Sequence, residues 1–269
     1  MKEKIEKTIS LLKKGEPLAI SLNPEGYYVA FSGGKDSQAL LQLVKEAGVR
    51  YHAKYSVTSN DPPENVYFIR KYYPEVKFVC NHPNYYQLIA RKGLPTHLRR
   101  FCCERLKENL GAGEVVLTGV RADESKKRAQ YKVFDIVSRR KEHANVSKRP
   151  TMQDVMQNEH RCIKGKDKIL LRPILDWTEV DVWRYLHSRG LPMNPCYDIV
   201  GRVGCMFCPF SNKAHIKVYE ERYPEFLQLL LSNLQRYLDN NAGGEFTDAR
   251  ECYEWWKTKK SVEKYRAGK

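Results

Sequence analysis

Residues 27–37 read YYVAFSGGKDS, and this stretch decides the fold class of the chain. The apolar run Tyr27–Phe31 is typical of a buried strand, and the apolar spacing that follows predicts a helix from Asp36 to Ala47. Two glycines lie between these elements and allow a tight turn from strand into helix. A strand that leads through such a turn into a helix is the repeating unit of an α/β fold.

The same alternation of strand and helix continues along the chain. Further strands are expected at 49–57, 76–80, 114–119 and 169–175, and Cys80 is expected to be a buried thiol. Further helices are expected at 2–14, 63–73, 85–91, 102–110, 178–188, 213–239 and 248–258. Thr178 and Asp181 have the spacing of a capping box, which predicts where the helix at 178–188 begins. Elements in this order predict a mostly parallel sheet flanked by helices.

The composition excludes several classes of protein. Hydrophobic residues make up 42% of the 269 residues, which is too many for a disordered chain. No apolar run approaches the roughly 20 residues that a transmembrane helix needs. The N-terminal MKEKIEKTISLLKK is charged on both sides of its short apolar stretch, unlike a secretory signal. We therefore expect a cytoplasmic, enzyme-sized protein with no membrane partner.

The net charge of +15 is concentrated in two segments. Segment 121–172 holds 15 Lys and Arg against 7 Asp and Glu, and segment 91–107 holds six against one. Such clusters favour an anionic partner, and nucleic acid is the candidate that they indicate. The alternative is a solvated basic loop, since segment 138–168 is polar, basic and aperiodic.

The loop Ser32–Ser37 (SGGKDS) has the chemistry of a phosphate site. It lies between a strand and a helix N-terminus, where backbone N–H groups and the helix dipole favour an anion. The glycines let the backbone approach a phosphate, the serines can donate hydrogen bonds, and Lys35 adds a positive charge. The spacing is not that of a Walker A loop, and a purely structural glycine turn is the alternative.

Four motifs indicate which family the chain resembles. SGGKDS at 32–37 resembles the PP-loop of the adenine nucleotide α-hydrolase superfamily, which includes ATP pyrophosphatases. Three further stretches resemble motifs of the phosphoadenosine phosphosulfate (PAPS) reductase family, namely FCCERLK at 101–107, GVRADES at 119–125 and PILDW at 173–177. The motifs follow one another in the order that the family has.

This resemblance implies a Rossmann-like fold that binds an adenine nucleotide across the carboxyl ends of its strands. The nucleotide would be ATP, adenosine phosphosulfate (APS) or PAPS, with Mg²⁺ neutralising its phosphates. The residues implied in nucleotide binding are Ser32, Gly33, Gly34, Lys35, Asp36, Ser37, Thr58, Gly119, Arg121 and Arg128. The residues implied in catalysis are Asp36, Ser37, Lys107 and Arg121. The nucleotide-binding domain would span 1–189, with a Cys-rich loop and helical region at 190–269 packed on it.

Eight cysteines in a chain with no secretory signal favour metal or redox chemistry over a disulfide framework. Cys205 and Cys208 form a C-x-x-C-P sequence typical of soft-metal sites, and further ligands must come from elsewhere. With Cys102 and Cys103 they would match the 4Fe–4S ligands of APS reductases. With Cys102 and Cys196 they would resemble the DndC-type sulfurtransferases of DNA phosphorothioation. A zinc ion held by four thiolates is the alternative to a cluster.

The chain departs from the reductases of this family near its C-terminus. Those enzymes carry a nucleophilic cysteine in an E-C-G-[LI]-H sequence, whereas Glu251-Cys252-Tyr253 lacks the glycine and the histidine. We therefore favour an iron–sulfur sulfurtransferase that adenylates an acceptor, for which nucleic acid is a candidate, and releases pyrophosphate. A cysteine desulfurase or a thiol reductant would be its protein partner. The alternatives are an APS or PAPS reductase that forms sulfite, and a non-catalytic nucleotide- or nucleic-acid-binding module with a structural zinc.

Overall fold

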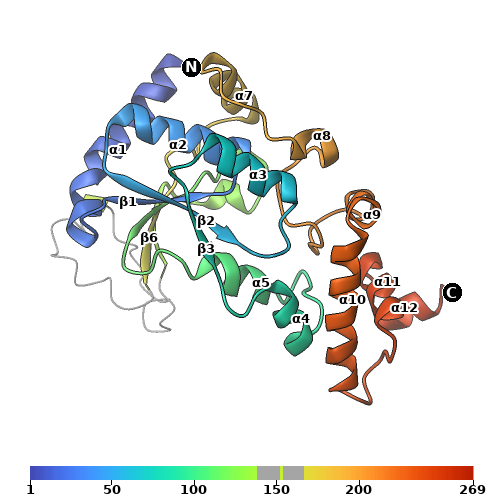
Figure 1. Cartoon of the computed structure of the whole chain (residues 1–269). Helices are drawn as coiled ribbons and strands as arrows, with labels where there is room; N and C mark the ends of the chain where they lie inside the picture. The colour runs from blue at the N-terminus through green and yellow to red at the C-terminus, as the bar shows by residue number, and fades with distance from the viewer. Residues whose placement is uncertain (138–151, 154–166, 269) are drawn as a thin grey trace. The chain divides into compact units, whose positions relative to one another are not determined.

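The computed structural model describes residues 1–137, 152–153 and 167–268. It contains a six-stranded sheet in the order β3-β2-β1-β4-β6-β5 (Figure 1). The strands are β1 (Tyr27–Phe31), β2 (Tyr51–Val57), β3 (Lys77–Cys80), β4 (Val115–Leu117), β5 (Phe134–Val137) and β6 (Lys168–Leu171). β1 pairs in parallel with β2 and β4, and β4 with β6, whereas β5 runs antiparallel to β6. The predicted α/β fold with a mostly parallel sheet is confirmed.

The strand order reverses between β1 and β4. The chain moves from β1 through β2 to β3 and then returns to β4 on the other side of β1. Sheets of this kind bind ligands at the carboxyl ends of the strands beside such a reversal. There β1 ends at Phe31, just before the loop Ser32–Ser37, and β4 ends at Leu117, just before Gly119. The topology therefore brings two motifs expected to bind nucleotide to one edge of the sheet.

The chain forms two compact units. The first contains Met1–Tyr55, Tyr67–Phe78 and Asn109–Asn194, and the second contains Ser56–Val66, Val79–Glu108 and Pro195–Lys269. The first unit therefore holds the loop Ser32–Ser37, and the second holds the cysteines at 102, 103, 196, 205 and 208. The division into functional domains at 1–189 and 190–269 stays a prediction.

The helix that follows the glycine turn is anchored in the core of the first unit. The first unit contains the helices α1 (Lys2–Leu22), α2 (Lys35–Ala47) and α7 (Glu179–Ser188), and α3 (Pro63–Tyr72) is divided between the two units. α2 packs against α1 and α7 (Figure 1). Its side chains Leu40, Leu41 and Leu43 are fully buried, and each such side chain contributes about 1.5–3 kcal/mol when it is buried. This packing fixes the position of the helix N-terminus at which the loop ends.

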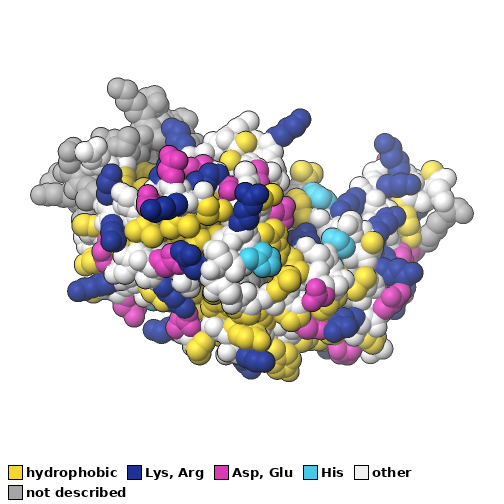
Figure 2. Space-filling model, turned by 90° about the horizontal axis from the view of Figure 1, so that it is seen from above, with side chains coloured by type: hydrophobic (Ala, Val, Ile, Leu, Met, Phe, Trp, Pro, Cys, Tyr) yellow, Lys and Arg dark blue, Asp and Glu magenta, His cyan; other side chains and the backbone are white. Residues whose placement is uncertain are grey.

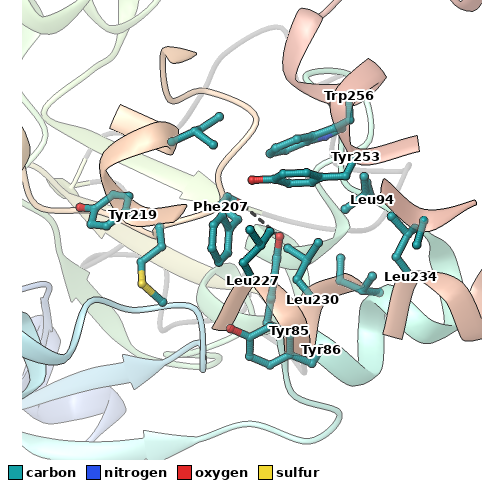
Figure 3. Packing of buried hydrophobic residues seen from close by; sticks show 14 of the residues in the cluster. Tyr85, Tyr86, Leu94, Phe207, Tyr219, Leu227, Leu230, Leu234, Tyr253 and Trp256 are labelled. Carbon is teal, nitrogen blue, oxygen red and sulfur yellow. Dashed lines mark hydrogen bonds between the residues drawn. The ribbon is translucent and has the colours of Figure 1, made fainter. Parts of the chain in front are cut away.

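The second unit is helical and has its own apolar core. Its elements are α4 (Tyr85–Lys92), α5 (Phe101–Cys103), a π-helical turn (Glu104–Glu108), α8 (Cys196–Val200), α9 (Lys213–Arg222), α10 (Pro224–Asp239), α11 (Ala249–Thr258) and α12 (Val262–Arg266). α10 packs against α4 and α11, and Figure 3 shows Leu230 and Leu234 of α10 among aromatic side chains of this core. Phe207, from the C-x-x-C sequence, is fully buried in the same core. The loop that carries Cys205 and Cys208 is thus anchored by one of its own side chains.

Some helices differ from those predicted. α1 continues to Leu22 instead of ending at residue 14, although Pro17 lies inside it. Leu18 and Ala19 are buried, and this packing outweighs the lost backbone hydrogen bond. The helix expected at 213–239 is two helices, because Pro224 lacks the N–H that would continue α9 and instead begins α10.

The edges of the sheet also differ from the prediction. Cys80 is exposed, so the prediction that it is buried is wrong. It ends β3, which is an outer strand of the sheet and has a neighbouring strand on one side only. The opposite edge is β5, an antiparallel strand that the apolar pattern did not predict.

The surface is rich in charge, as its composition requires. Lys and Arg side chains are interspersed with Asp and Glu over the face drawn in Figure 2. The basic segment 91–107 lies wholly within the described residues. Most of the basic loop 138–168, which is part of segment 121–172, lies outside them, at 138–151 and 154–166. No helix in the described ranges is both long enough and apolar enough to cross a membrane.

Candidate functional site

The turn between β1 and α2 depends on its two glycines. Gly33 has a φ of +78°, a left-handed conformation that side chains with a Cβ disfavour. Gly34 stands at the N-cap of α2 with φ −79° and ψ 160°. A Ser, Thr or Asp at that position would place its own oxygen on the helix N-terminus. Glycine has no side chain to occupy the helix N-terminus, so an external anion can bind there, and the helix dipole favours its negative charge.

The two serines close the loop upon itself. The Ser37 hydroxyl is buried, donates to the Gly34 carbonyl at 2.9 Å and lies 3.0 Å from the Ser32 hydroxyl. The Ser32 backbone N–H donates to Ser37 Oγ at 3.2 Å. Ser37 therefore sets the shape of the loop, while Ser32 stands at its exposed side.

Two buried amide side chains orient the peptide between the glycines. Gln38 Nε2 and Asn194 Nδ2 both donate to the Gly33 carbonyl, at 3.1 and 2.9 Å. Tyr73 donates its hydroxyl proton to Gln38 Oε1 at 2.7 Å and so fixes which end of that amide faces the loop. In a trans peptide the N–H points away from the carbonyl, so the Gly34 N–H faces the side of the Ser32 hydroxyl.

Gln38 and Asn194 were not among the predicted site residues. One signal did exist for Gln38, because it is a polar residue at a core-facing position of an apolar helix, and it is almost fully buried. Asn194 gave no such signal, since its partner lies 161 residues away in the sequence.

Charged side chains surround the first turn of α2. Arg121 is 3% exposed and its Nε donates to Asp36 Oδ1 at 2.6 Å, while Lys35 Nζ lies 3.4 Å from Asp36 Oδ2. Arg121 also pairs with Asp123. A Cβ added at Gly119 would lie 2.9 Å from the backbone carbonyl of Asp36, so only glycine lets the β4 end approach the loop this closely. The structure thus brings Lys35, Asp36, Gly119 and Arg121 together with the loop.

Arg128 behaves differently from the other predicted cations. It forms an ion pair with Glu124, four residues before it in the chain. Its side chain is 39% exposed, against 3% for that of Arg121. Its contact with a nucleotide stays a prediction.

Four of the five candidate ligand cysteines line one small pocket in the second unit. Cys102 and Cys103 come from α5, and Cys205 and Cys208 come from the loop before α9. The wall is completed by Thr58, Asn60, Tyr85, Leu106, Lys107, Phe207 and Pro209. The structure therefore brings Cys102 and Cys103, from a distant part of the chain, to the C-x-x-C sequence.

The backbone of the C-x-x-C loop is held by hydrogen bonds from other segments. The Asn60 side chain donates to the Phe207 carbonyl and accepts from the Phe207 N–H, both at 3.2 Å. The Asn60 carbonyl accepts from Met206 N–H at 2.8 Å, and the Tyr85 hydroxyl donates to the Phe207 carbonyl at 2.9 Å. A pair of thiols on a loop rich in glycine is thus fixed without any disulfide.

Cations lie beside two of the pocket thiols, with Lys107 at Cys205 and Arg100 at Cys103. Lys107 Nζ is 3.2 Å from Cys205 Sγ, and the charge on that sulfur raises the pKa of Lys107. A hydrogen bond from Cys102 lowers the pKa of Cys103 to about 6, and Arg100 acts in the same direction. Burial raises the pKa of Cys205, while Lys107 opposes this shift. Thiolate is the form of cysteine that binds metals, so these cations suit a metal site.

Cys196 lies apart from these four thiols. It is fully buried at the start of α8, and it is not among the residues that line the pocket. Burial raises the pKa of Cys196 to about 12, and Glu64 adds to the shift. Within the described residues, no three His, Cys, Asp or Glu side chains converge closely enough to hold a metal ion. The donor chemistry of the four pocket thiols suits iron or zinc, and ligation itself stays a prediction.

Two residues predicted to bind nucleotide or to act in catalysis, Thr58 and Lys107, line this pocket. Thr58 Oγ1 is 3.8 Å from Cys205 Sγ, and Lys107 contacts the same sulfur. Both had been assigned to the nucleotide by resemblance, and those roles stay predictions.

Known proteins resemble this chain over much of its length. A protein of Methanocaldococcus jannaschii described as uncharacterized is 26% identical over 87% of this chain and 54% of its own. Sulfate adenylyltransferase subunit 2 of a Sulfurovum species is 28% identical over 51% of this chain and 43% of its own. The chain thus spans about half the length of these curated relatives.

A solved structure supports the fold. FMN adenylyltransferase of Candida glabrata, in complex with FMN and an ATP analogue, superposes with a TM-score of 0.50 at 16% identity, over 76% of this chain and 61% of its own. At sequence level, residues 26–211 match the family model described as the phosphoadenosine phosphosulfate reductase domain. This match takes in the glycine turn, the β4 edge and the C-x-x-C loop, and the chain belongs to that family.

Proposed function

We propose that this protein is an adenine-nucleotide-dependent sulfurtransferase that adenylates its acceptor and releases pyrophosphate. The observation that carries the proposal is the loop Ser32–Ser37, whose Gly33–Gly34 peptide is held by Gln38 and Asn194 at the N-terminus of α2. Such a turn suits phosphate oxygens, and relatives named adenylyltransferase support an adenylyl-transfer reaction.

The proposed reaction begins with attack of an acceptor oxygen on the α-phosphorus of ATP. The bond between the α-phosphorus and the bridging oxygen breaks, and pyrophosphate leaves with the electron pair. The Gly34 N–H and the charges of Lys35 and Arg121 would stabilise the negative charge that develops. Asp36 is suited to bind Mg²⁺ on the phosphates, since carboxylate oxygen is the ligand that this ion prefers. Sulfur from a donor, for which a cysteine desulfurase is the candidate, would then displace AMP.

The four pocket thiols would hold the proposed 4Fe–4S cluster, with zinc as the alternative metal. Cys102, Cys103, Cys205 and Cys208 line one pocket, and this supports the first of the two ligand sets over the one that includes Cys196. A cluster bound there would supply redox-active iron. Lys107 would balance the negative charge of the thiolates, as its position 3.2 Å from Cys205 allows.

The competing function, reduction of APS or PAPS, is less well supported. It needs a reactive cysteine near the C-terminus, where this chain offers Cys252. Cys252 is 7% exposed within α11, and burial raises its pKa to about 11. A buried, protonated thiol is a poor nucleophile. Sulfite formed from APS and thioredoxin by the wild type, and lost in Cys252→Ser, would restore the reductase assignment.

Nucleotide binding and turnover test the proposal. We expect Asp36→Ala and Ser37→Ala to abolish pyrophosphate release and to weaken ATP binding measured by calorimetry. Ser188→Ala is the matched control, because the Ser188 hydroxyl also donates to a backbone carbonyl but lies at the end of α7. Pyrophosphate release that continues unchanged in both loop variants would contradict the proposal. Anaerobic purification should yield about four irons per chain, whereas one zinc and no iron would remove the cluster from it.

A further inference from the structure

A second cavity in the helical unit has no role in the function proposed above. It encloses about 310 Å³, at the lower end of the range for ligand pockets. Its wall includes His97 and Leu98 from the basic segment 91–107, Trp255 and Trp256 from α11, and Lys259 and Lys260 just after that helix. Leu98 is 97% exposed, which is unusual for a large apolar side chain. A wall of this kind suits a flat ligand with an apolar face.

The two indole rings of this cavity are fixed before any ligand binds. Trp256 stacks on Tyr253 with ring centroids 5.6 Å apart, as Figure 3 shows, and its Nε1 donates to the Pro95 carbonyl at 2.6 Å. Trp255 packs on Phe246 with centroids 5.2 Å apart, and its Nε1 donates to the Lys260 carbonyl at 2.9 Å. Trp256 is only 6% exposed, so a ligand would pack mainly on Trp255, whose fixed ring loses little conformational entropy.

The wall of the cavity carries positive charge. Three lysines line it, at 257, 259 and 260, and no Asp or Glu of the described part of the chain does. Lys257 is paired with Glu220 and Glu254, and Lys259 Nζ donates to the Ser211 carbonyl. Lys260 is exposed, and Arg99 and Arg100 follow Leu98 along the chain. The exposed lysine of the wall therefore favours an anionic group on the ligand.

We propose that this cavity binds one unstacked base of a single-stranded nucleic acid, with flanking phosphates near Lys260 and Arg99. Aromatic rings bordered by cations are the combination that binds single strands, because every base offers a flat face and every nucleotide a phosphate. This inference rests on the proposed function in one respect, because the single-stranded nucleic acid would be the acceptor that the proposed sulfurtransferase adenylates. The cavity itself lies wholly within the second unit.

The test compares two labelled 12-nucleotide RNA probes by fluorescence anisotropy with the full chain. One probe is intact, and the other lacks its bases at the central positions. Stacking of a base contributes about 1–3 kcal/mol, so the intact probe should bind at least fivefold more tightly. His97→Ala, which removes an aromatic ring from the wall of the cavity, should remove this difference between the probes. Lys260→Glu should weaken both probes and reduce the salt dependence of binding.

Lys2→Glu is the matched control, because it makes the same change of charge at an exposed position in the first unit. Equal affinity for the two probes, or equal loss in Lys260→Glu and Lys2→Glu, would overturn the inference. Binding of a peptide rich in Glu and Trp, together with no binding of RNA, would assign the cavity to a protein partner and would also overturn the inference. ATP binding measured by calorimetry without RNA separates the two proposals, because Ser37→Ala should lose its affinity for ATP and keep its affinity for the RNA probe.

Discussion

The loop Ser32–Ser37 and the pocket of four thiols are built in opposite ways. The loop is one continuous hexapeptide, and most of its hydrogen bonds join residues within five positions of each other. The pocket draws its walls from residues at 58–60, 85, 102–107 and 205–209. A local motif can be identified from sequence by itself, whereas a site assembled from four segments exists only in the folded chain. Substitutions in the loop should therefore affect ATP binding, whereas substitutions in the pocket should affect the iron content.

The largest expected effect is loss of a pocket thiol. Cys205→Ser and Cys208→Ser should reduce the iron content from about four atoms per chain to less than one, because a 4Fe–4S cluster needs all of its thiolates. Iron and sulfide analysis after anaerobic purification provides the measurement. Cys80→Ser is the control, since Cys80 is exposed and lies at the sheet edge. The affinity of the two cysteine variants for ATP should not change. A loss of ATP affinity together with the iron would show that the two sites are not independent.

Asn194→Asp should produce the largest effect on the loop. A carboxylate cannot donate to the Gly33 carbonyl and repels it, so the Gly33–Gly34 peptide loses its orientation. A lost buried hydrogen bond with repulsion costs about 2 kcal/mol, or roughly thirtyfold in ATP affinity. The KM for ATP should rise and kcat should fall, whereas a purely structural role would lower the unfolding temperature alone.

Asn233→Asp in α10 is the matched control for this variant. Asn233 is also buried, and it donates to the Leu229 carbonyl at 2.8 Å. It should cost similar stability while ATP binding stays as in the wild type. If both variants weakened ATP binding equally, Asn194 would have no specific role at the loop.

Asn60→Ala should have an effect of intermediate size, and it should affect the pocket of four thiols and not the loop Ser32–Ser37. It removes two hydrogen bonds from the Phe207 backbone and should lower the free energy of unfolding by about 2 kcal/mol. The C-x-x-C loop should then release iron to a chelator faster. Asn241→Ala, which removes an exposed bond to the Tyr237 carbonyl, is the comparison. Iron release at the wild-type rate would show that the thiols do not depend on Asn60.

The smallest expected effect is at the capping box of α7, which is a local motif of Thr178 and Asp181. Asp181→Ala should cost about 1 kcal/mol, measured by thermal unfolding. Burial alone would raise the pKa of Asp181, but hydrogen bonds from Lys4 and Thr178 hold it at about 2. Because the folded pKa is depressed, this stabilisation is complete above the ordinary pKa of the carboxyl. It should be lost as the pH falls from about 4 towards 2. A variant whose difference from wild type persists at pH 2 would contradict this.

The parts of the fold that follow from local pattern were predicted closely. β1 has the bounds that its apolar run indicated, α2 begins one residue earlier than expected, and Thr178 and Asp181 form the predicted capping box. The bonds that shape the sites were not predicted. Gln38 and Asn194 at the loop, and Asn60 at the pocket, act through contacts that the sequence order does not reveal. The sequence also did not reveal that Cys196 is buried and does not line the pocket, whereas the other four candidate cysteines are partly buried and do line it.

The pairing of Arg121 with Asp36 has a consequence for how a nucleotide enters. The guanidinium already has a carboxylate partner at 2.6 Å, so the loop does not present an uncompensated cation to solvent. An incoming phosphate must therefore share or replace that partner, and binding becomes an exchange of counter-ions at one guanidinium. Such an exchange depends little on ionic strength, since it leaves the number of charge pairs almost unchanged. A divalent cation that takes Asp36 would release Arg121 Nε to the phosphate while Asp123 keeps the other side of the guanidinium, which makes metal and nucleotide binding mutually favourable.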